Sequence, residues 1–268
     1  MSMNDIQVRG NRVQFYEAGS GTPLVYLHGI ADTHGLLERP TDLLEELSTN
    51  FRVIAPAHPG CAGTAEDQAL ESIDDLVFHT LEVLDAFDLD KYLLVGNCIG
   101  GWLAAEMAVR HPEKIQKIGL ISPSGLKVSG SLTGDLFMAI QPLDGTVVEA
   151  RDMMFADGSS NLAKSVLADQ TTEIKEGLMR YQVFRFSARI GFKPPYFYHD
   201  KLRERLYRFL PPAKIITGEK NTFVPVEHAK AYEEGFSDGQ LVLIDGCGHA
   251  VHLENPNRTA SELTDFLS

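Results

Sequence analysis

A lone cysteine between glycines is the clearest candidate for chemistry in this sequence. Residues 96–101 read GNCIGG and follow the apolar run YLLV, which predicts a buried strand that ends in a sharp turn. A strand, then Gly-x-nucleophile-x-Gly, then a helix is the pattern of a nucleophile elbow, in which the turn lifts the middle side chain above the sheet. Cys98 holds the middle position, where the helix N-terminus favours a thiolate or an oxyanion. The hexapeptide therefore predicts a nucleophilic cysteine.

The elements that must position Cys98 are those of a mostly parallel sheet. Short apolar runs of the kind found in strands buried on both faces recur along the chain, at residues 24–29, 51–58, 92–97, 117–122, 214–219 and 241–246. Apolar residues at helical spacing predict a helix over residues 73–87. Strands that alternate with helices imply right-handed crossovers, with ligand chemistry beyond the carboxyl ends of the strands.

Two segments depart from this alternation. Residues 6–16 alternate apolar and polar side chains on both sides of Gly10-Asn11, which predicts an antiparallel hairpin. Residues 125–208 contain no strand-like run and mix helical stretches with Met, Phe and Tyr. We interpret this segment as a helical cap, inserted into a core made of residues 1–124 and 209–268.

Five short segments, in this order, resemble those of the α/β-hydrolase fold superfamily. They are His28-Gly29 after the first parallel strand, APAHPG at 55–60, GNCIGG at 96–101, GEKNTFVP at 218–225 and GCGHAVHLENP at 246–256. The resemblance covers nearly the whole chain. It implies an α/β-hydrolase fold, with a mostly parallel twisted sheet flanked by helices and a helical cap insertion.

The resemblance also assigns roles to individual residues. It makes Cys98 the nucleophile and His249 the base, and it makes the backbone amides of Ile30 and Ile99 the oxyanion hole. Asn221 stands at the position of the triad acid. We expect no metal and no cofactor, because Cys98, Cys247 and His249 lack the further ligands that a tetrahedral site needs.

Both departures from the usual Ser-His-Asp triad fall on catalytic positions, at Cys98 and Asn221. In a serine triad, replacing the aspartate by asparagine costs about 10⁴ in turnover. A free thiol has a pKa of about 8.5 and can form a thiolate–imidazolium pair with a histidine, so a neutral asparagine would suffice to orient the ring. Two other readings stay open: a homologue that has lost its catalytic groups, and a hydrolase disabled by Ser-to-Cys and Asp-to-Asn replacements.

The side chains expected to line the substrate pocket are apolar: Phe137, Met153 and Phe184 from the cap, and Phe223. They predict an apolar acyl or carbonyl substrate. The expected chemistry is acyl transfer through a Cys98 thioester, as hydrolysis of an ester, thioester or lactone, or as acyl transfer or cyclisation. The alternatives are a non-catalytic or weakly catalytic small-molecule-binding homologue, and a lyase or dioxygenase that uses His249 without attack by Cys98.

The composition argues against nucleic acid and membranes as partners and against secretion. Lys and Arg number 24 against 37 Asp and Glu, with a net charge of −13, so nucleic acid is not an expected partner. No apolar run approaches the about 18 to 20 residues that span a bilayer, and the first residues do not form a signal peptide. The three cysteines form no CxxC pair. We expect a cytoplasmic protein without a membrane partner; its oligomeric state is left open.

Overall fold

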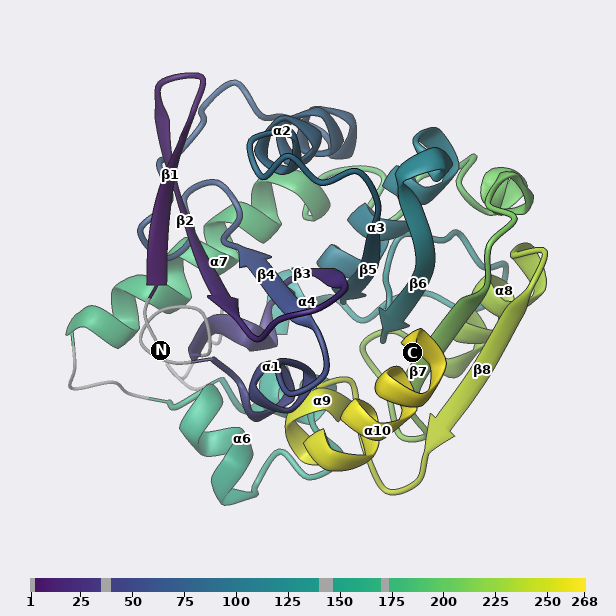
Figure 1. Cartoon of the computed structure of the whole chain (residues 1–268). Helices are drawn as coiled ribbons and strands as arrows, with labels where there is room; N and C mark the ends of the chain where they lie inside the picture. The colour runs from purple at the N-terminus through teal and green to yellow at the C-terminus, as the bar shows by residue number, and fades with distance from the viewer. Residues whose placement is uncertain (1–2, 35–39, 140–146, 170–173) are drawn as a thin grey trace.

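One eight-stranded sheet organises the computed structural model, which describes residues 3–34, 40–139, 147–169 and 174–268 (Figure 1). The strand order is β1-β2-β4-β3-β5-β6-β7-β8. Strands β3 to β8 run parallel, whereas β1 and β2 form an antiparallel hairpin whose second strand pairs antiparallel with β4. The strands are β1 (Met3–Val8), β2 (Asn11–Ala18), β3 (Pro23–Leu27), β4 (Arg52–Pro56), β5 (Tyr92–Asn97), β6 (Ile115–Ile121), β7 (Ala213–Gly218) and β8 (Gly239–Ile244).

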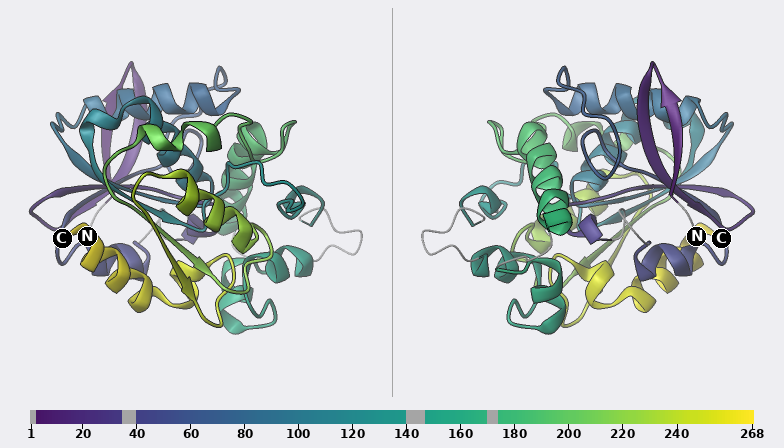
Figure 2. Two further views of the ribbon diagram at one scale, coloured as in Figure 1. Left: turned by 90° about the vertical axis from the view of Figure 1, so that its right-hand side faces the viewer. Right: turned by 90° about the vertical axis from the view of Figure 1, so that its left-hand side faces the viewer.

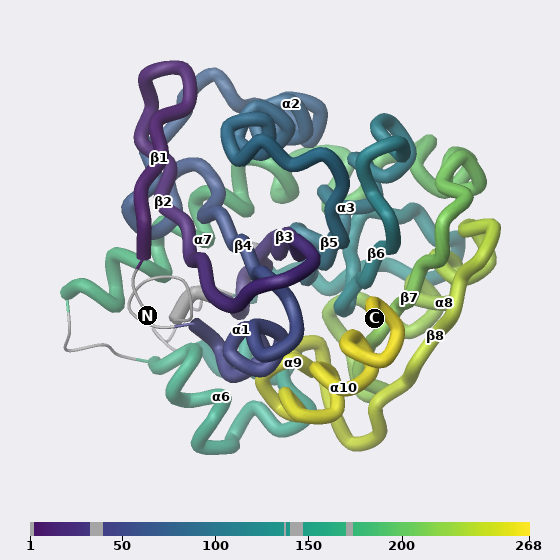
Figure 3. The backbone as a smooth tube through the Cα atoms, in the orientation of Figure 1, coloured from purple at the N-terminus to yellow at the C-terminus, as the bar shows by residue number. Residues whose placement is uncertain are grey.

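The predicted hairpin and the mostly parallel sheet are both confirmed. The backbone trace places the β1–β2 hairpin at one edge of the sheet and β8 at the other (Figure 3). All six residues of β5 are buried, as the apolar run before Cys98 predicts for a strand covered on both faces. Strand β5 therefore delivers Cys98 from the middle of the sheet.

Helices cover both faces of the sheet (Figure 2). One apolar cluster joins the sheet to α2 (Ile73–Asp85), α3 (Ile99–Arg110) and α8 (Val226–Gly235). A second cluster lies on the other face, with α1 (Asp42–Leu47) and α10 (Pro256–Leu267). The helix predicted over residues 73–87 is α2, which begins with a capping box between Ser72 and Asp75.

The predicted cap, residues 125–208, contains helices joined by irregular segments, such as residues 125–135 and 192–202. It contains α4 (Leu136–Ala139), α5 (Val148–Met154), α6 (Asn161–Val166), α7 (Ile174–Gly191) and the 3₁₀ helix η3 (Arg203–Arg208). Figure 2 shows α5, α6 and α7, in teal and green, on the side of the molecule opposite the β1–β2 hairpin. The Ala250 N–H donates to the Met154 carbonyl at 2.8 Å, so α5 touches the loop that follows β8.

The turn at Cys98 requires glycine on both sides. Cys98 has φ 54° and ψ −116°, a conformation that L-residues rarely adopt. A Cβ at Gly96 would lie 2.3 Å from the Gly100 carbonyl oxygen, and one at Gly100 would lie 2.1 Å from the Leu27 carbonyl oxygen. The two glycines therefore let α3 pass close over β5 and β3, the steric role that the sequence predicts for them.

Replacing Gly100 by alanine tests this crossing. Because the new methyl group would meet backbone atoms that cannot rotate away, we expect Gly100→Ala to lower the free energy of unfolding by about 3 kcal/mol in urea titration. Gly134→Ala is the control, since the nearest atom there is the flexible thioether sulfur of Met153 at 3.1 Å. Equal losses in the two variants would contradict the argument.

Candidate active site

The sulfur of Cys98 is enclosed by the two backbone amides that the sequence predicts. Cys98 is 1% exposed. The N–H groups of Ile30, after β3, and Ile99, the first residue of α3, both hydrogen-bond to its thiol. The nucleophile position and the two candidate oxyanion-hole donors, one of them about seventy positions away in the sequence, therefore meet at one point.

Burial keeps the Cys98 thiol neutral. It raises the pKa of Cys98 to about 12, and the nearby charge of Asp32 adds to the rise, while the amides of Ile30 and Ile99 oppose it. The expected thiolate–imidazolium pair is therefore wrong for this state of the protein. Two hydrogen bonds and a helix N-terminus do not compensate for removing the thiolate from water.

His249 lies in the loop between β8 and α9 (Val251–Glu254), and its ring is also buried. The ring of Phe223 packs edge-on against it, with centroids 4.8 Å apart. Within the described part of the chain neither ring nitrogen of His249 has a hydrogen-bond partner. Burial lowers the pKa of His249 to about 3, so the imidazole is neutral and has a free lone pair, as a general base requires.

Asn221 does not bond to His249 as the sequence led us to expect. Its side-chain amide donates to the Thr217 hydroxyl at 3.0 Å, and its side-chain carbonyl accepts from the Val224 N–H at 2.9 Å. Both polar groups are therefore used inside the turn that follows β7. The competing local bonds explain the correction, because asparagine side chains readily bond the backbone a few residues ahead.

Asp32 is the buried carboxylate of the site, in the segment that follows β3. Its Oδ2 accepts from the Gly29 N–H at 2.7 Å, the Asn97 side-chain amide at 2.9 Å and the Tyr26 hydroxyl at 3.0 Å. Its Oδ1 lies 2.9 Å from Nε2 of His252. Burial alone would raise the pKa of Asp32, but His252 and these donors hold it well below its usual range. In the sequence, the one sign of this buried cluster is His252, a second histidine three residues after His249.

Among the predicted pocket residues whose side chains the structure describes, Phe223 packs against the candidate base His249. Met153 is half-buried on α5, and its carbonyl accepts from the Thr222 hydroxyl at 3.4 Å. Phe184 packs against the core from α7. Phe137 belongs to α4, but its side chain lies outside the described part of the structure.

A large cavity opens beside Phe223. It has a volume of about 800 Å³ and is lined by residues 126–136, residues from 192 to 198, Arg203 and His228. Phe197 lines this cavity and packs edge-on against Phe223, with centroids 5.5 Å apart. Because Phe223 also touches His249, a single aromatic ring separates the cavity wall from the candidate base.

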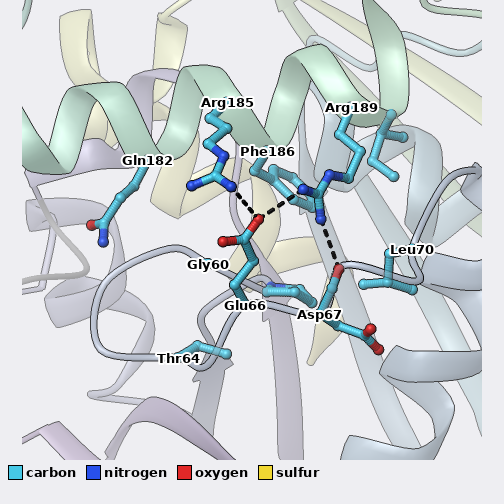
Figure 4. Close-up of a pocket in the computed structure, with 11 residues that line it drawn as sticks. Gly60, Thr64, Glu66, Asp67, Leu70, Gln182, Arg185, Phe186 and Arg189 are labelled. Carbon is cyan, nitrogen blue, oxygen red and sulfur yellow. Dashed lines mark hydrogen bonds and ion pairs between the residues drawn. The ribbon is translucent and has the colours of Figure 1, made fainter.

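A smaller cavity of about 140 Å³ lies between α7 and the loop at residues 59–70 (Figure 4). Arg185 and Arg189 converge on one carboxylate oxygen of Glu66, at 2.6 and 2.7 Å. Arg189 also donates to the Asp67 carbonyl at 2.7 Å. Since these bonds join α7 to the loop at residues 59–70, we assign this cluster to anchoring α7 on the core.

Among the described residues, no group of three or more His, Cys, Asp or Glu side chains could hold a metal ion. The helices described there include none with the length and apolar character needed to cross a membrane.

The fold and the site together define a class. A nucleophile elbow after a central parallel strand and a histidine after the last strand are the arrangement of α/β hydrolases. The family model described as "alpha/beta hydrolase fold" matches residues 22–256, and the chain belongs to this family.

Particular relatives are hydrolases, which supports an enzyme of this fold. A 2-hydroxymuconate semialdehyde hydrolase of Pseudomonas sp. (strain CF600) is 27% identical, over 98% of this chain and 93% of its own. Monoacylglycerol lipase ABHD6 of Bos taurus is 25% identical, over 97% of this chain and 81% of its own. The fold is also that of a meta-cleavage product hydrolase from Pseudomonas fluorescens IP01 (TM-score 0.77, 22% identity, 98% of this chain and 97% of the other covered).

The pH dependence of alkylation tests the state of Cys98. A group with a raised pKa is protonated up to that pKa, so the thiolate fraction should still be rising at pH 9. We expect the rate of Cys98 modification by iodoacetamide to increase about tenfold per pH unit from pH 7 to 9, followed by peptide mass spectrometry that separates Cys98 from Cys61 and Cys247. A plateau below pH 8.5 would instead restore the thiolate–imidazolium pair.

Proposed function

We propose that this protein hydrolyses an apolar ester, thioester or lactone through a covalent thioester on Cys98. The observation that carries the proposal is the convergence of the Ile30 and Ile99 amides on the Cys98 sulfur at the elbow. In that geometry a carbonyl carbon attacked by the sulfur has its oxygen next to both N–H groups. Such donors are worth about 10² to 10³ each in rate.

The steps follow from a neutral thiol and a neutral imidazole. As the C–S bond forms, the Cys98 proton moves to His249 and the negative charge goes to the carbonyl oxygen, beside the Ile30 and Ile99 amides. The leaving group departs with the proton from His249. Water then gives a proton to His249 and attacks the thioester, which releases the acid and returns the proton to the Cys98 sulfur. No step requires a free buried thiolate.

The large cavity supports an apolar substrate. Its lining includes Phe192, Phe197 and the loop from Leu126 to Leu136, and its volume suits a small organic molecule. Phe197 in the cavity wall packs against Phe223, which in turn packs against His249. A substrate held in the cavity would therefore reach His249 past these two rings. The relatives' names, a semialdehyde hydrolase and a monoacylglycerol lipase, support a substrate with an attacked carbonyl group next to an apolar part.

A second candidate function is small-molecule binding without turnover. It is favoured by the position of Asn221, whose polar groups bond to Thr217 and Val224 and leave His249 without an orienting partner. The two candidates differ in what happens to Cys98, so mass spectrometry separates them.

Covalent labelling of Cys98 tests the proposed chemistry. We expect p-nitrophenyl esters to add one acyl mass to Cys98. Because hydrolysis of the thioester follows its formation, acid quenching is used to keep the acyl group in place, and its mass should then be visible in the intact protein and in the Cys98 peptide. Cys98→Ala should lose both the added mass and at least 10³-fold of the turnover. Full turnover in Cys98→Ala would overturn the proposal and favour chemistry by His249 alone.

Restoring the usual triad residues distinguishes an adapted site from a disabled one. We expect Cys98→Ser to lose at least 10³-fold in kcat/KM, because a serine needs a charged acid behind its histidine. Asn221→Asp should stay within about tenfold of the unmodified protein, since Asn221 acts inside its own turn. The measurement is kcat/KM for these variants and for the double variant. A double variant far more active than the unmodified protein would identify a disabled serine hydrolase.

A further inference from the structure

We infer that Asp32 is a positioning residue that holds the oxyanion loop, the elbow and the base loop in their relative places. The inference rests on the proposed function, because it concerns the amide of Ile30, the sulfur of Cys98 and the ring of His249. One side chain bonds to the segments that carry all three groups.

The bond to the oxyanion loop fixes the direction of the Ile30 amide. The Gly29 N–H donates to Asp32 at 2.7 Å, and Gly29 directly precedes Ile30. A Cβ at Gly29 would lie 2.8 Å from the Cβ of Cys98 and 2.8 Å from the Asn97 carbonyl oxygen. This loop is therefore pressed against the elbow, and a small rotation at Gly29 would turn the planar Gly29–Ile30 peptide away from the sulfur.

The bond to the elbow holds the end of β5. Asn97 directly precedes Cys98, and its side-chain amide donates to Asp32 at 2.9 Å. The same amide nitrogen lies 3.2 Å from Nε2 of His252. Nε2 of His252 also faces Oδ1 of Asp32, and one ring nitrogen cannot both donate to that oxygen and accept from the Asn97 amide. The bond between Asn97 and Asp32 is therefore the one that ties the elbow to the oxyanion loop.

The bond to the base loop acts through His252. Nε2 of His252 lies 2.9 Å from Oδ1 of Asp32, and His252 follows His249 by three residues, on α9. The residue before His249 is held as well. The carboxylate of Glu254 accepts from the Gly248 N–H at 2.6 Å and from the N–H of Ala156, in the cap, at 2.8 Å. The base is thus held between the Asp32 cluster and a contact with the cap.

Charge provides a second argument for a geometric role. The charge of Asp32 opposes ionisation of Cys98. Asp32 therefore does not make the thiol more reactive, whereas its hydrogen bonds and its contact with His252 connect the three segments.

Two reactions at the same sulfur separate positioning from stability. Acylation by a p-nitrophenyl ester places a carbonyl oxygen between the Ile30 and Ile99 amides. Alkylation by iodoacetamide forms a C–S bond at a saturated carbon with loss of iodide, and it needs no oxyanion donor. The ratio of the two rates, measured for Cys98 by peptide mass spectrometry in variants that circular dichroism shows to be folded, reports the oxyanion geometry.

We expect Asp32→Ala to lower this ratio at least 10²-fold, the effect of losing one oxyanion donor, and Asp32→Asn to lower it about tenfold. Alkylation should stay equal or become faster, because a negative charge near the thiol is removed. If Asp32→Ala does not fold, the isosteric Asp32→Asn carries the test. Glu262→Gln is the matched control, since it removes a half-buried carboxylate that pairs with Lys214 at 3.1 Å on another part of the sheet.

A ratio unchanged in both Asp32 variants, as in Glu262→Gln, would overturn the inference. If the unmodified protein forms no acyl-Cys98, the proposed function fails instead. Hydrogen exchange then tests the positioning by itself. At least tenfold faster exchange at the Ile30 and Ile99 amides in Asp32→Asn, but not in Glu262→Gln, supports it, and unchanged exchange overturns it.

Discussion

The site depends on the close backbone crossing of α3 over the ends of β5 and β3. Glycines at 96 and 100 allow this approach, since a Cβ at either position would lie within 2.3 Å of a carbonyl oxygen. The crossing forces Cys98 into a positive φ and puts its sulfur between two amides from different elements. A constraint that belongs to backbone packing thus creates the geometry of the candidate active site.

Burial then decides which groups carry charge. Asp32 is held ionised by its donors and by His252, whereas Cys98 and His249 are shifted toward their neutral forms. Concentrating the charge on Asp32, whose Oδ2 accepts three hydrogen bonds, avoids an unpaired thiolate and imidazolium in a dry site. In the proposed mechanism, the advantage of cysteine lies in a thioester that reacts readily with a second nucleophile, and in a thiol that gives up its proton more easily than a serine hydroxyl does.

Local patterns in the sequence predicted the parallel strands, the hairpin and the elbow, because periodicity and glycine spacing record short-range constraints. The two amides beside the elbow were assigned by the resemblance to the α/β-hydrolase superfamily. Asp32 was missed because its partners Asn97 and His252 lie 65 and 220 positions further along the chain, where no spacing relates them. The misassignment of Asn221 had a different cause. Family position outweighed a local signal, an asparagine whose side chain bonds to the N–H three residues ahead.

The cap and the base loop are mechanically connected. The carbonyl of Met154 accepts from the Ala250 N–H, and Glu254 joins Ala156 to Gly248, so two bonds from the predicted cap flank His249. The ring of Phe223 fills the remaining side. Because Cys98 and His249 are both about 1% exposed, substrate must displace part of this enclosure to reach the sulfur.

A displacement of α5 would shift the His249 loop as well, whereas a displacement of Phe223 from the cavity side would leave the bonds of Glu254 in place. Entry past Phe223 is therefore the route that preserves the geometry on which the proposed attack by Cys98 depends.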